Sequence, residues 1–581
     1  MFRSNDSHRQ QEMFSTFASL PDKRRQRLEG SWAGTFYREV FCRLDERPFA
    51  VLYADEPSRP NIPVNVLVGL EVLKSGFGWS DEELYDAFQF NLQVRYALGC
   101  RDLSGDDFEL RTLYNFRHRL SAHMRATGEN LLERAFEQIT DAQIAALPVR
   151  TGLQRVDSTM IASNIRQLSR LQLLVEVLQR VYRMLCATDQ EREAEAFAPY
   201  LQGTSGQYCY RLKGEEIPAH LEQIGPLMQR LVTELAAAYG DEPTYQVLCR
   251  VFAENFALDE DSAPPPSAGS PPRVRAKAKK ELSARSLQSP DDLEATFRQK
   301  GRQTCRGYVL NVMETCDPAN ALQLVTKVQV APNCTDEGDL LRQALPNVKA
   351  RTELAELWSD GSYSGPPTEA ALRQHQVKQI LTGIRGQPPD PAQMGLVEFV
   401  WEVDEARVAH HVTCPGGQRV EVQPGGAADT YRVYFDVALC VACPRAAACR
   451  TVPLQRQPVR CLRGLVRRDI ELARLRQEIA QVQTLDYNLR AAVEATIRSC
   501  KHPFGGKPPV RGQVRMSMFC VASAIMVNAR RIWRYWMAQE PEQRRDPQRG
   551  AFLLLRLAKT VKRWLWPFET RHTTSWAVQP A

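Results

Sequence analysis

Three acidic residues lie where regular patterns in the sequence end or change. Asp157 follows a short strand pattern in LQRVDST, Asp360 ends the apolar run LAELWSD, and Glu494 lies in the helical pattern of YNLRAAVEATIRSCK. Converging carboxylates repel one another unless a cation or a shared proton is present. Two Mg²⁺ or Mn²⁺ ions held by such acids could activate a nucleophile and stabilise the leaving oxygen of a phosphodiester. Each acid alone is weak evidence, because an Asp that ends a strand is often an ordinary turn residue.

Polar residues around Glu494 share one side of a helix predicted over residues 487–504. They are Tyr487, Arg490, Glu494 and Lys501. At about 100° per residue they fall within a stripe roughly 60° wide. Arg490 and Lys501 could bind phosphates on either side of Glu494, and Tyr487 could stack on or hydrogen-bond to nucleic acid. The solvated face of an ordinary amphipathic helix explains the same pattern without a ligand.

Four cysteines are spaced like the ligands of a metal site. Cys440 and Cys443 form a C-x2-C pair, Cys449 follows them, and Cys414 precedes them beside a Pro-Gly-Gly turn. A structural Zn²⁺ takes four such ligands in tetrahedral geometry. Cys461 is an alternative fourth ligand in place of Cys414. Four free thiols in a small β-rich domain are the competing interpretation.

The composition is that of a soluble protein with several structural units. The chain has 581 residues, of which 43% are hydrophobic and 25% charged, and this length exceeds that of one ordinary core. The first residues lack the apolar run of a signal peptide, and no stretch reaches 18 apolar residues, so we expect no membrane partner. The 15 cysteines are therefore predicted to be thiols or metal ligands rather than disulfides.

Positive charge is concentrated near the C-terminal end. The whole chain carries a net charge of +7, whereas residues 500–581 contain 15 Lys and Arg against 4 Asp and Glu. Five of the nine tryptophans lie in the same segment. A basic segment with interspersed aromatic residues suits a phosphate backbone. Basic helices that pack their aromatic side chains into a core would look the same.

The order of the patterns predicts an α/β fold, a mixed sheet flanked by helices, preceded by helices alone. In the N-terminal part, tight turns join short helices, one of which begins with a capping box of Ser80 and Glu83. This arrangement is compatible with a helix-turn-helix DNA reader and with a plain helical bundle. The predicted units are an N-terminal helical domain (1–145), DNA-binding if it is the helix-turn-helix reader, the first parts of a core that carries the acids (150–165 and 295–395), a helical insertion (166–257), a disordered Pro/Ser/basic linker (258–294), a Cys-rich β insertion (396–465), the last part of the core (466–530) and a basic aromatic tail (531–581).

The chain resembles the DDE transposases of bacterial insertion sequences. The spacing Y-x2-R-x3-E-x6-K from Tyr487 to Lys501, RVDST around Asp157 and SDGSY around Asp360 match the three acidic motifs of that family. Residues 59–99 resemble the helical N-terminal domain of one branch, and the insertion-sequence group eleven-eighty-two is the most similar. The motifs cover roughly residues 40–165 and 295–530.

The resemblance implies a ribonuclease-H-like core that cuts and joins DNA. Asp157, Asp360 and Glu494 would be the catalytic residues and hold two Mg²⁺ or Mn²⁺ ions, while Tyr487, Arg490 and Lys501 would position the DNA. The implied partners are double-stranded terminal inverted repeats and target DNA, bound by a homodimer in the bacterial cytoplasm, associated with the nucleoid. The alternatives are an inactive, transposase-derived DNA-binding protein and a ribonuclease-H-like nuclease with other substrates, such as RNA–DNA hybrids.

Overall fold

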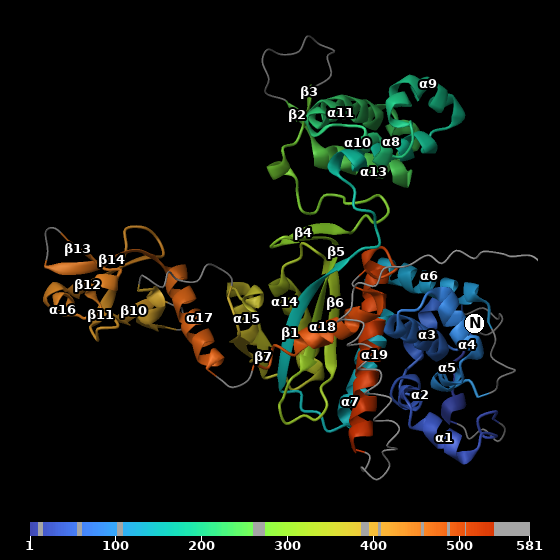
Figure 1. Ribbon diagram of the computed structural model, residues 1–581, viewed down its shortest axis with the longest axis horizontal. Helices are drawn as coiled ribbons and strands as arrows, with labels where there is room; N and C mark the ends of the chain where they lie inside the picture. Colours follow the sequence, from blue (N-terminus) through green and yellow to red (C-terminus); the bar gives the residue numbers. More distant parts are fainter. Residues whose placement is uncertain are drawn as a thin grey trace, which may run out of the picture.

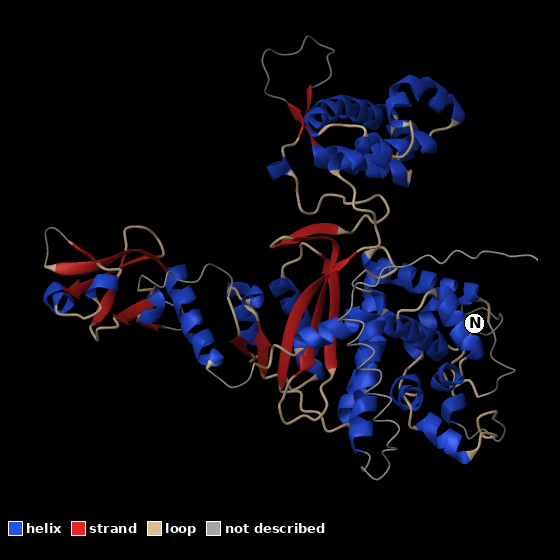
Figure 2. Ribbon diagram, in the orientation of Figure 1, coloured by secondary structure: helices blue, strands red, loops and turns tan. Residues whose placement is uncertain are grey.

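The structure of the chain is a computed structural model with a central mixed sheet and three further parts around it (Figures 1 and 2). The residues that it describes are 1–9, 15–54, 61–101, 108–259, 273–384, 394–404, 408–454, 458–484, 488–505 and 507–539. The predicted α/β class with a mixed sheet flanked by helices is confirmed.

The central sheet combines antiparallel and parallel strands. Its strands are β1 (Leu153–Ala162), β4 (Thr296–Lys300), β5 (Gln303–Thr315), β6 (Val325–Pro332), β7 (Glu356–Ser359) and β8 (Lys378–Leu381). The order is β4-β5-β1-β7-β8, with β6 also paired to β5. β5 is antiparallel to β1, β4 and β6, whereas β7 is parallel to both β1 and β8.

The two faces of β1 contact different helices, because successive side chains of a strand point to opposite sides. Val156 belongs to an apolar cluster with Leu341 and Leu345 of α14 (Glu337–Arg351) and Leu372 of α15 (Pro366–Gln374). The other face of β1 carries Asp157 and is covered by α18 (Val493–Lys501) and the long α19 (Gln513–Gln539).

The strand that carries Asp157 differs from the sequence prediction. Asp157 was expected at the tip of a short strand, but β1 continues for five residues beyond it, to Ala162. The full-length pairing with β5, from Gln154 opposite Thr315 to Ala162 opposite Gly307, explains the extension. The polar residues Ser158 and Thr159 follow Asp157, so apolar periodicity alone did not predict that the strand continues.

The N-terminal part is helical, as predicted. Its α-helices are α1 (Asp22–Glu29), α2 (Trp32–Phe36), α3 (Val64–Phe77), α4 (Asp81–Phe90), α5 (Leu92–Ala97), α6 (Leu110–Thr127) and α7 (Leu131–Ala146). α3 ends at Gly78, whose φ of 72° is left-handed, and the predicted capping box of Ser80 and Glu83 starts α4. The pattern over 80–99 forms two helices rather than one, because the Asn91 side chain caps α5.

Helix α19 joins the N-terminal helices to the central sheet (Figure 1). Asn528 exchanges two hydrogen bonds with the backbone of Val325 on β6, at 2.8 and 3.0 Å. On its other side α19 contacts α3 so closely that a Cβ atom on Gly76 would lie 2.2 Å from Met526 Cγ. The tail predicted from residue 531 begins later, since α19 runs to Gln539, and residues 540–581 lie outside the described residues.

A second helical part, with its own apolar core, follows β1. Its elements are α8 (Arg170–Met184), α9 (Ala187–Phe197), α10 (Ser205–Tyr210), α11 (Ile217–Glu234), α12 (Ala236–Tyr239), α13 (Pro243–Asn255), β2 (Phe256–Asp259) and β3 (Arg273–Ala276). The prediction of disorder over 258–294 needs correction for the described part, because β3 pairs with β2 and residues 277–294 are placed against this helical part and the core. The Pro-rich stretch 260–272 lies outside the described residues.

A second sheet forms the Cys-rich subdomain, which comprises the described residues between 394 and 484 (Figure 2). Its elements are β9 (Val400–Val403), β10 (Ala409–Thr413), β11 (Arg419–Pro424), β12 (Thr430–Asp436), α16 (Val437–Val441), β13 (Val452–Pro453), β14 (Val459–Val466) and α17 (Arg467–Gln483). α17 was assigned to the last part of the core, but its Ile470 and Ala473 belong to the apolar cluster of this subdomain. Within the described ranges, no helix is long and apolar enough to cross a membrane.

Candidate active site

Asp157 and Asp360 are brought together by the register of two parallel strands. Arg155 of β1 is level with Trp358 of β7. Two residues further along each strand, the same register puts Asp157 level with Asp360, which follows β7 directly. Adjacent parallel strands place their residues at the same height along the sheet, so these two carboxylates become neighbours although 203 positions separate them.

The guanidinium of Arg490 bridges the two acids. Its Nη2 lies 2.9 Å from Asp157 Oδ2 and 3.6 Å from Asp360 Oδ2. Asp157 is buried, and this burial raises the pKa of Asp157 above its ordinary value, although the charge of Arg490 acts in the opposite direction. Within the described part of the chain, the buried Nε of Arg490 has no hydrogen-bond partner. The space between the acids therefore already accommodates a positive charge.

The backbone after β7 holds Asp360 in place. Its Oδ1 accepts hydrogen bonds from the backbone N–H of Ser362, at 2.8 Å, and from the Ser362 hydroxyl. The next residue, Tyr363, is fully buried and donates to Asn311 Oδ1 on β5 at 2.6 Å. Burial also raises the pKa of the Tyr363 hydroxyl well above its ordinary value, so it remains a donor. The SDGSY segment thus fixes the acid through its serine and its tyrosine.

The segment from residue 487 to residue 504 is not one continuous helix. Tyr487 lies outside the described residues, Arg490 lies in a turn, and α18 begins only at Val493. The predicted single stripe is therefore corrected: Arg490 reaches Asp157 from the turn, whereas Glu494 and Lys501 lie on the helix. Glu494 is exposed, while Val493, Thr496 and Ile497 form the buried side.

Both ends of this segment are attached to the same face of β1. Arg155 Nη1 donates to the backbone O of Leu489 at 2.6 Å, and Lys501 Nζ donates to Thr159 Oγ1 at 3.1 Å and to Met160 O at 3.0 Å. Desolvation lowers the pKa of the half-buried Lys501. Since Arg490 also contacts Asp157, the first turn of α18, which carries Glu494, starts beside the two aspartates.

A buried carboxylate on β5 attaches α18 to the central sheet. Glu314 is completely buried and accepts hydrogen bonds from Arg155 Nε, Thr496 Oγ1 and Arg531 Nη1, each at 2.7 Å. These donors come from β1, α18 and α19. A buried charge of this kind is tolerated only when it is paired and fully hydrogen-bonded, so Glu314 ties three elements together beneath the site.

The described residues do not form a closed metal site. In the described ranges, no group of three His, Cys, Asp or Glu side chains is placed to hold a metal ion. The chemistry of the aspartate pair nevertheless fits a divalent cation, because two aligned carboxylates already flank a cationic group. Glu494 is the sequence-predicted acid that the structure does not bring into this pair.

Two functional candidates were missed by sequence reasoning. One is Glu314, which supports α18. The other is Glu337, a buried residue at the start of α14 that accepts hydrogen bonds from Arg298 at 2.5 Å and from Ser158 Oγ at 3.4 Å, and Ser158 directly follows Asp157 in the chain. The signal for Glu314 was its position in the strand RGYVLNVMET, where alternation places this acid on the same side as apolar residues such as Leu310 and Val312. Glu337 gave no comparable signal, because an acid in the first turn of a helix is common.

Comparison with known families places a transposase signature in the N-terminal part. Residues 26–119 match the family model described as "Transposase domain (DUF772)". The match runs from within α1 into α6, and it supports a relationship to transposases. No curated protein and no solved structure matches the chain.

Proposed function

We propose that this chain is a DDE transposase with a ribonuclease-H-like core, which binds double-stranded terminal repeats and cuts and joins DNA strands. The observation that carries the proposal is the alignment of Asp157 with Asp360 on adjacent parallel strands, with Arg490 between them. The transposase-domain match to residues 26–119 supports it from a separate part of the chain.

In this proposal, Asp157, Asp360 and Glu494 hold two Mg²⁺ or Mn²⁺ ions. When bound, such ions generate a nucleophilic hydroxide or alkoxide and neutralise charge on the phosphate. Glu494 is exposed on the first turn of α18, so its side chain can turn toward the pair without leaving a buried position. The first reaction is attack of water on a phosphodiester, which releases a 3′-OH, and in the second that 3′-OH attacks target DNA.

The cationic residues near the acids are suited to hold a phosphate backbone. The planar guanidinium of Arg490 can donate hydrogen bonds to a phosphate oxygen in place of a carboxylate. We infer that DNA draws Arg490 away from Asp157 and so makes the carboxylate available to a cation. Lys501 anchors α18 and retains one further N–H for a phosphate. We propose a homodimer as the assembly, with one chain acting at each of two DNA ends.

The deciding experiment is metal-dependent cleavage of linear DNA that carries the flanks of this gene. We expect wild-type protein to nick the DNA at defined flank positions with Mg²⁺ or Mn²⁺, whereas Asp157→Ala and Glu494→Gln bind the same DNA without cutting it. Glu421→Gln, which alters an exposed carboxylate on β11, is the matched control and should cut normally.

Each outcome discriminates between the proposed activity and its alternatives. Binding without cleavage by wild-type protein, in either metal, would identify a DNA-binding protein derived from a transposase. Cleavage of RNA–DNA hybrids in preference to the flanks would identify a nuclease of another kind. Cleavage that persists in Glu494→Gln would remove Glu494 from the metal-binding set.

A further inference from the structure

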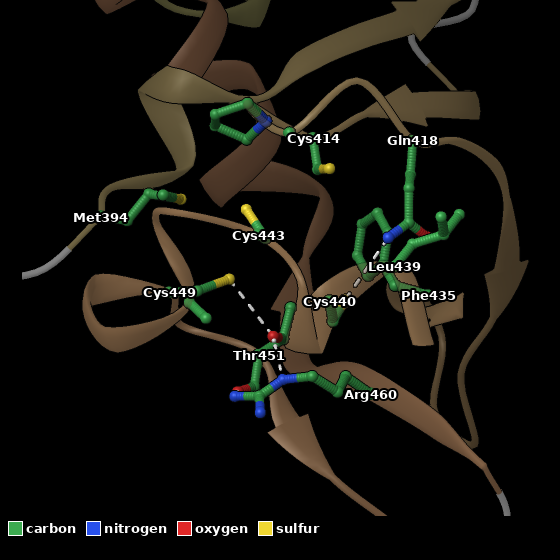
Figure 3. A pocket seen from close by; sticks show the side chains of 13 residues that line it. Met394, Cys414, Gln418, Phe435, Leu439, Cys440, Cys443, Cys449, Thr451 and Arg460 are labelled. Carbon is green, nitrogen blue, oxygen red and sulfur yellow. Dashed lines mark hydrogen bonds between the residues drawn. The ribbon is translucent and has the colours of Figure 1, made fainter. Parts of the chain in front are cut away.

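Four cysteines line one pocket of the Cys-rich subdomain (Figure 3). Cys414 follows β10, Cys440 lies in α16, and Cys443 and Cys449 lie between α16 and β13. The described residues that line the pocket do not include Cys461, which is buried in β14 and contacts the backbone O of Leu462 at 3.4 Å. Of the two candidates for the fourth ligand, the fold therefore places Cys414, and not Cys461, beside the other three cysteines.

The turn after Cys414 leaves room for sulfur atoms to approach one another. Cys414 N–H donates to Gln418 O, and Gly417 N–H donates to Cys414 O, both at 2.9 Å. A Cβ atom on Gly416 would lie 3.1 Å from Cys443 Sγ and 3.6 Å from Cys414 Sγ. The two sulfur atoms thus flank a glycine whose missing side chain would otherwise separate them.

Apolar packing of the segment that carries the other three cysteines is slight, and Cys440 and Cys449 are its side chains that pack, partly buried, against the apolar cluster of the subdomain. None of residues 437–450 is buried, and the largest apolar side chains are mostly exposed, Leu439 at 59% and Val441 at 76%. The residues of this segment that are partly covered are Val437, Cys440, Cys443, Ala446 and Cys449. A metal or a disulfide often supports small structural units with little apolar burial, and none of the four cysteines is in a disulfide.

Polar donors already face two of the sulfur atoms. Gln418 Nε2 lies 3.5 Å from Cys440 Sγ. Thr451 Oγ1 lies 3.2 Å from Cys449 Sγ and itself accepts from Arg460 Nε at 2.9 Å (Figure 3). Such outer contacts orient thiolate ligands and offset their negative charge. Both contacts are compatible with thiolate ligands of a metal ion.

We propose that Cys414, Cys440, Cys443 and Cys449 bind one structural Zn²⁺ that fastens residues 437–451 to the turn after β10. Thiolates favour Zn²⁺ among the divalent ions, and a complete set of four leaves no open position for catalysis. In the described ranges no group of three Cys, His, Asp or Glu side chains is placed to hold a metal ion, so the proposal requires the four sulfur atoms to move closer together when Zn²⁺ binds. This proposal is independent of the proposed transposase activity.

The test measures metal in the full-length protein, purified from zinc-supplemented growth. We expect about one zinc per chain in wild type, and Cys443→Ala should lose most of it. Cys461→Ala, a neighbouring buried thiol outside the pocket, is the matched control and should retain its zinc. Absence of zinc from wild type, iron in its place, or equal loss in both variants would overturn the proposal.

A second measurement does not depend on a variant that folds. Wild-type protein stripped by a chelator is titrated with Co²⁺, and we expect the visible absorption bands of tetrahedral thiolate coordination at one equivalent. Hydrogen exchange should accelerate in residues 437–451 after stripping, while β12, which contains the buried Val433 and Phe435, stays protected. Octahedral cobalt spectra or unchanged exchange would contradict a zinc-held segment.

Discussion

Replacing Glu314 by Gln should destabilise the central sheet strongly, because it removes a charge and keeps the side-chain volume. Glu314 is 0% exposed, and the side chains of its partners Arg155 and Arg531 are 8% and 21% exposed. A glutamine would present an N–H group toward donors that now meet a carboxylate oxygen, and it would leave buried arginine charge without a partner. Breaking a buried ion pair from one side costs about 3–5 kcal/mol.

The assay is thermal unfolding, combined with local hydrogen exchange. For a cooperative unit of roughly 150–250 residues, each kcal/mol shifts Tm by about 2–4 °C, so we expect a decrease of roughly 6–20 °C. Exchange should rise first in residues 489–501, since Arg155 and Thr496 attach that segment to the sheet. Metal-dependent cleavage should fall as well, because α18 carries Glu494.

A matched control is the exposed ion pair between Glu402 and Arg419, whose atoms are as close as 2.7 Å. Glu402→Gln should leave Tm almost unchanged, because solvent screens such a pair. If Glu314→Gln changed Tm no more than Glu402→Gln, the buried charges would contribute little. The apolar contacts of Val493 and Ile497 would then be what holds α18.

Two further predictions concern Lys501, which contacts β1, and Asp157, which belongs to β1. Lys501→Ala should weaken binding of the DNA ends and reduce the slope of log K against log salt by about 0.9, the value for one phosphate contact. An unchanged slope would mean that Lys501 contacts no phosphate and has only the structural role given by its hydrogen bonds with Thr159 and Met160. Burial raises the pKa of Asp157, so the stability linked to its protonation is present below the unfolded pKa of about 3.9 and is lost as pH rises through the folded pKa. The raised pKa means that desolvation of the Asp157 carboxylate outweighs its attraction to Arg490, so Asp157→Asn should raise Tm at pH 7, and the gain should shrink as pH falls toward about 4. A gain that is constant with pH would exclude this ionisation as its cause.

Local features of the fold could be predicted because neighbouring residues decide them. The capping box at Ser80 and Glu83 and the left-handed glycine that ends α3 depend on contacts within one turn of helix. The acid motifs around Asp157 and Asp360 could be found for the same reason, since both are short contiguous patterns. Helix and strand types were largely correct, whereas the continuous helix from residue 487 failed where Arg490 turns toward Asp157.

The sequence by itself determined which residues carry chemical groups and which local elements hold them: the three acids, the C-x2-C pair and the helical N-terminal part. Only the tertiary structure decided that Asp157 and Asp360 lie level across β1 and β7, that Arg490 bridges them, and that Glu314 supports α18. These relations arise from strand register and from hydrogen bonds between residues far apart in the chain. Periodicity in one sequence reports the environment of neighbouring residues, and it contains no information on which distant strands will pair.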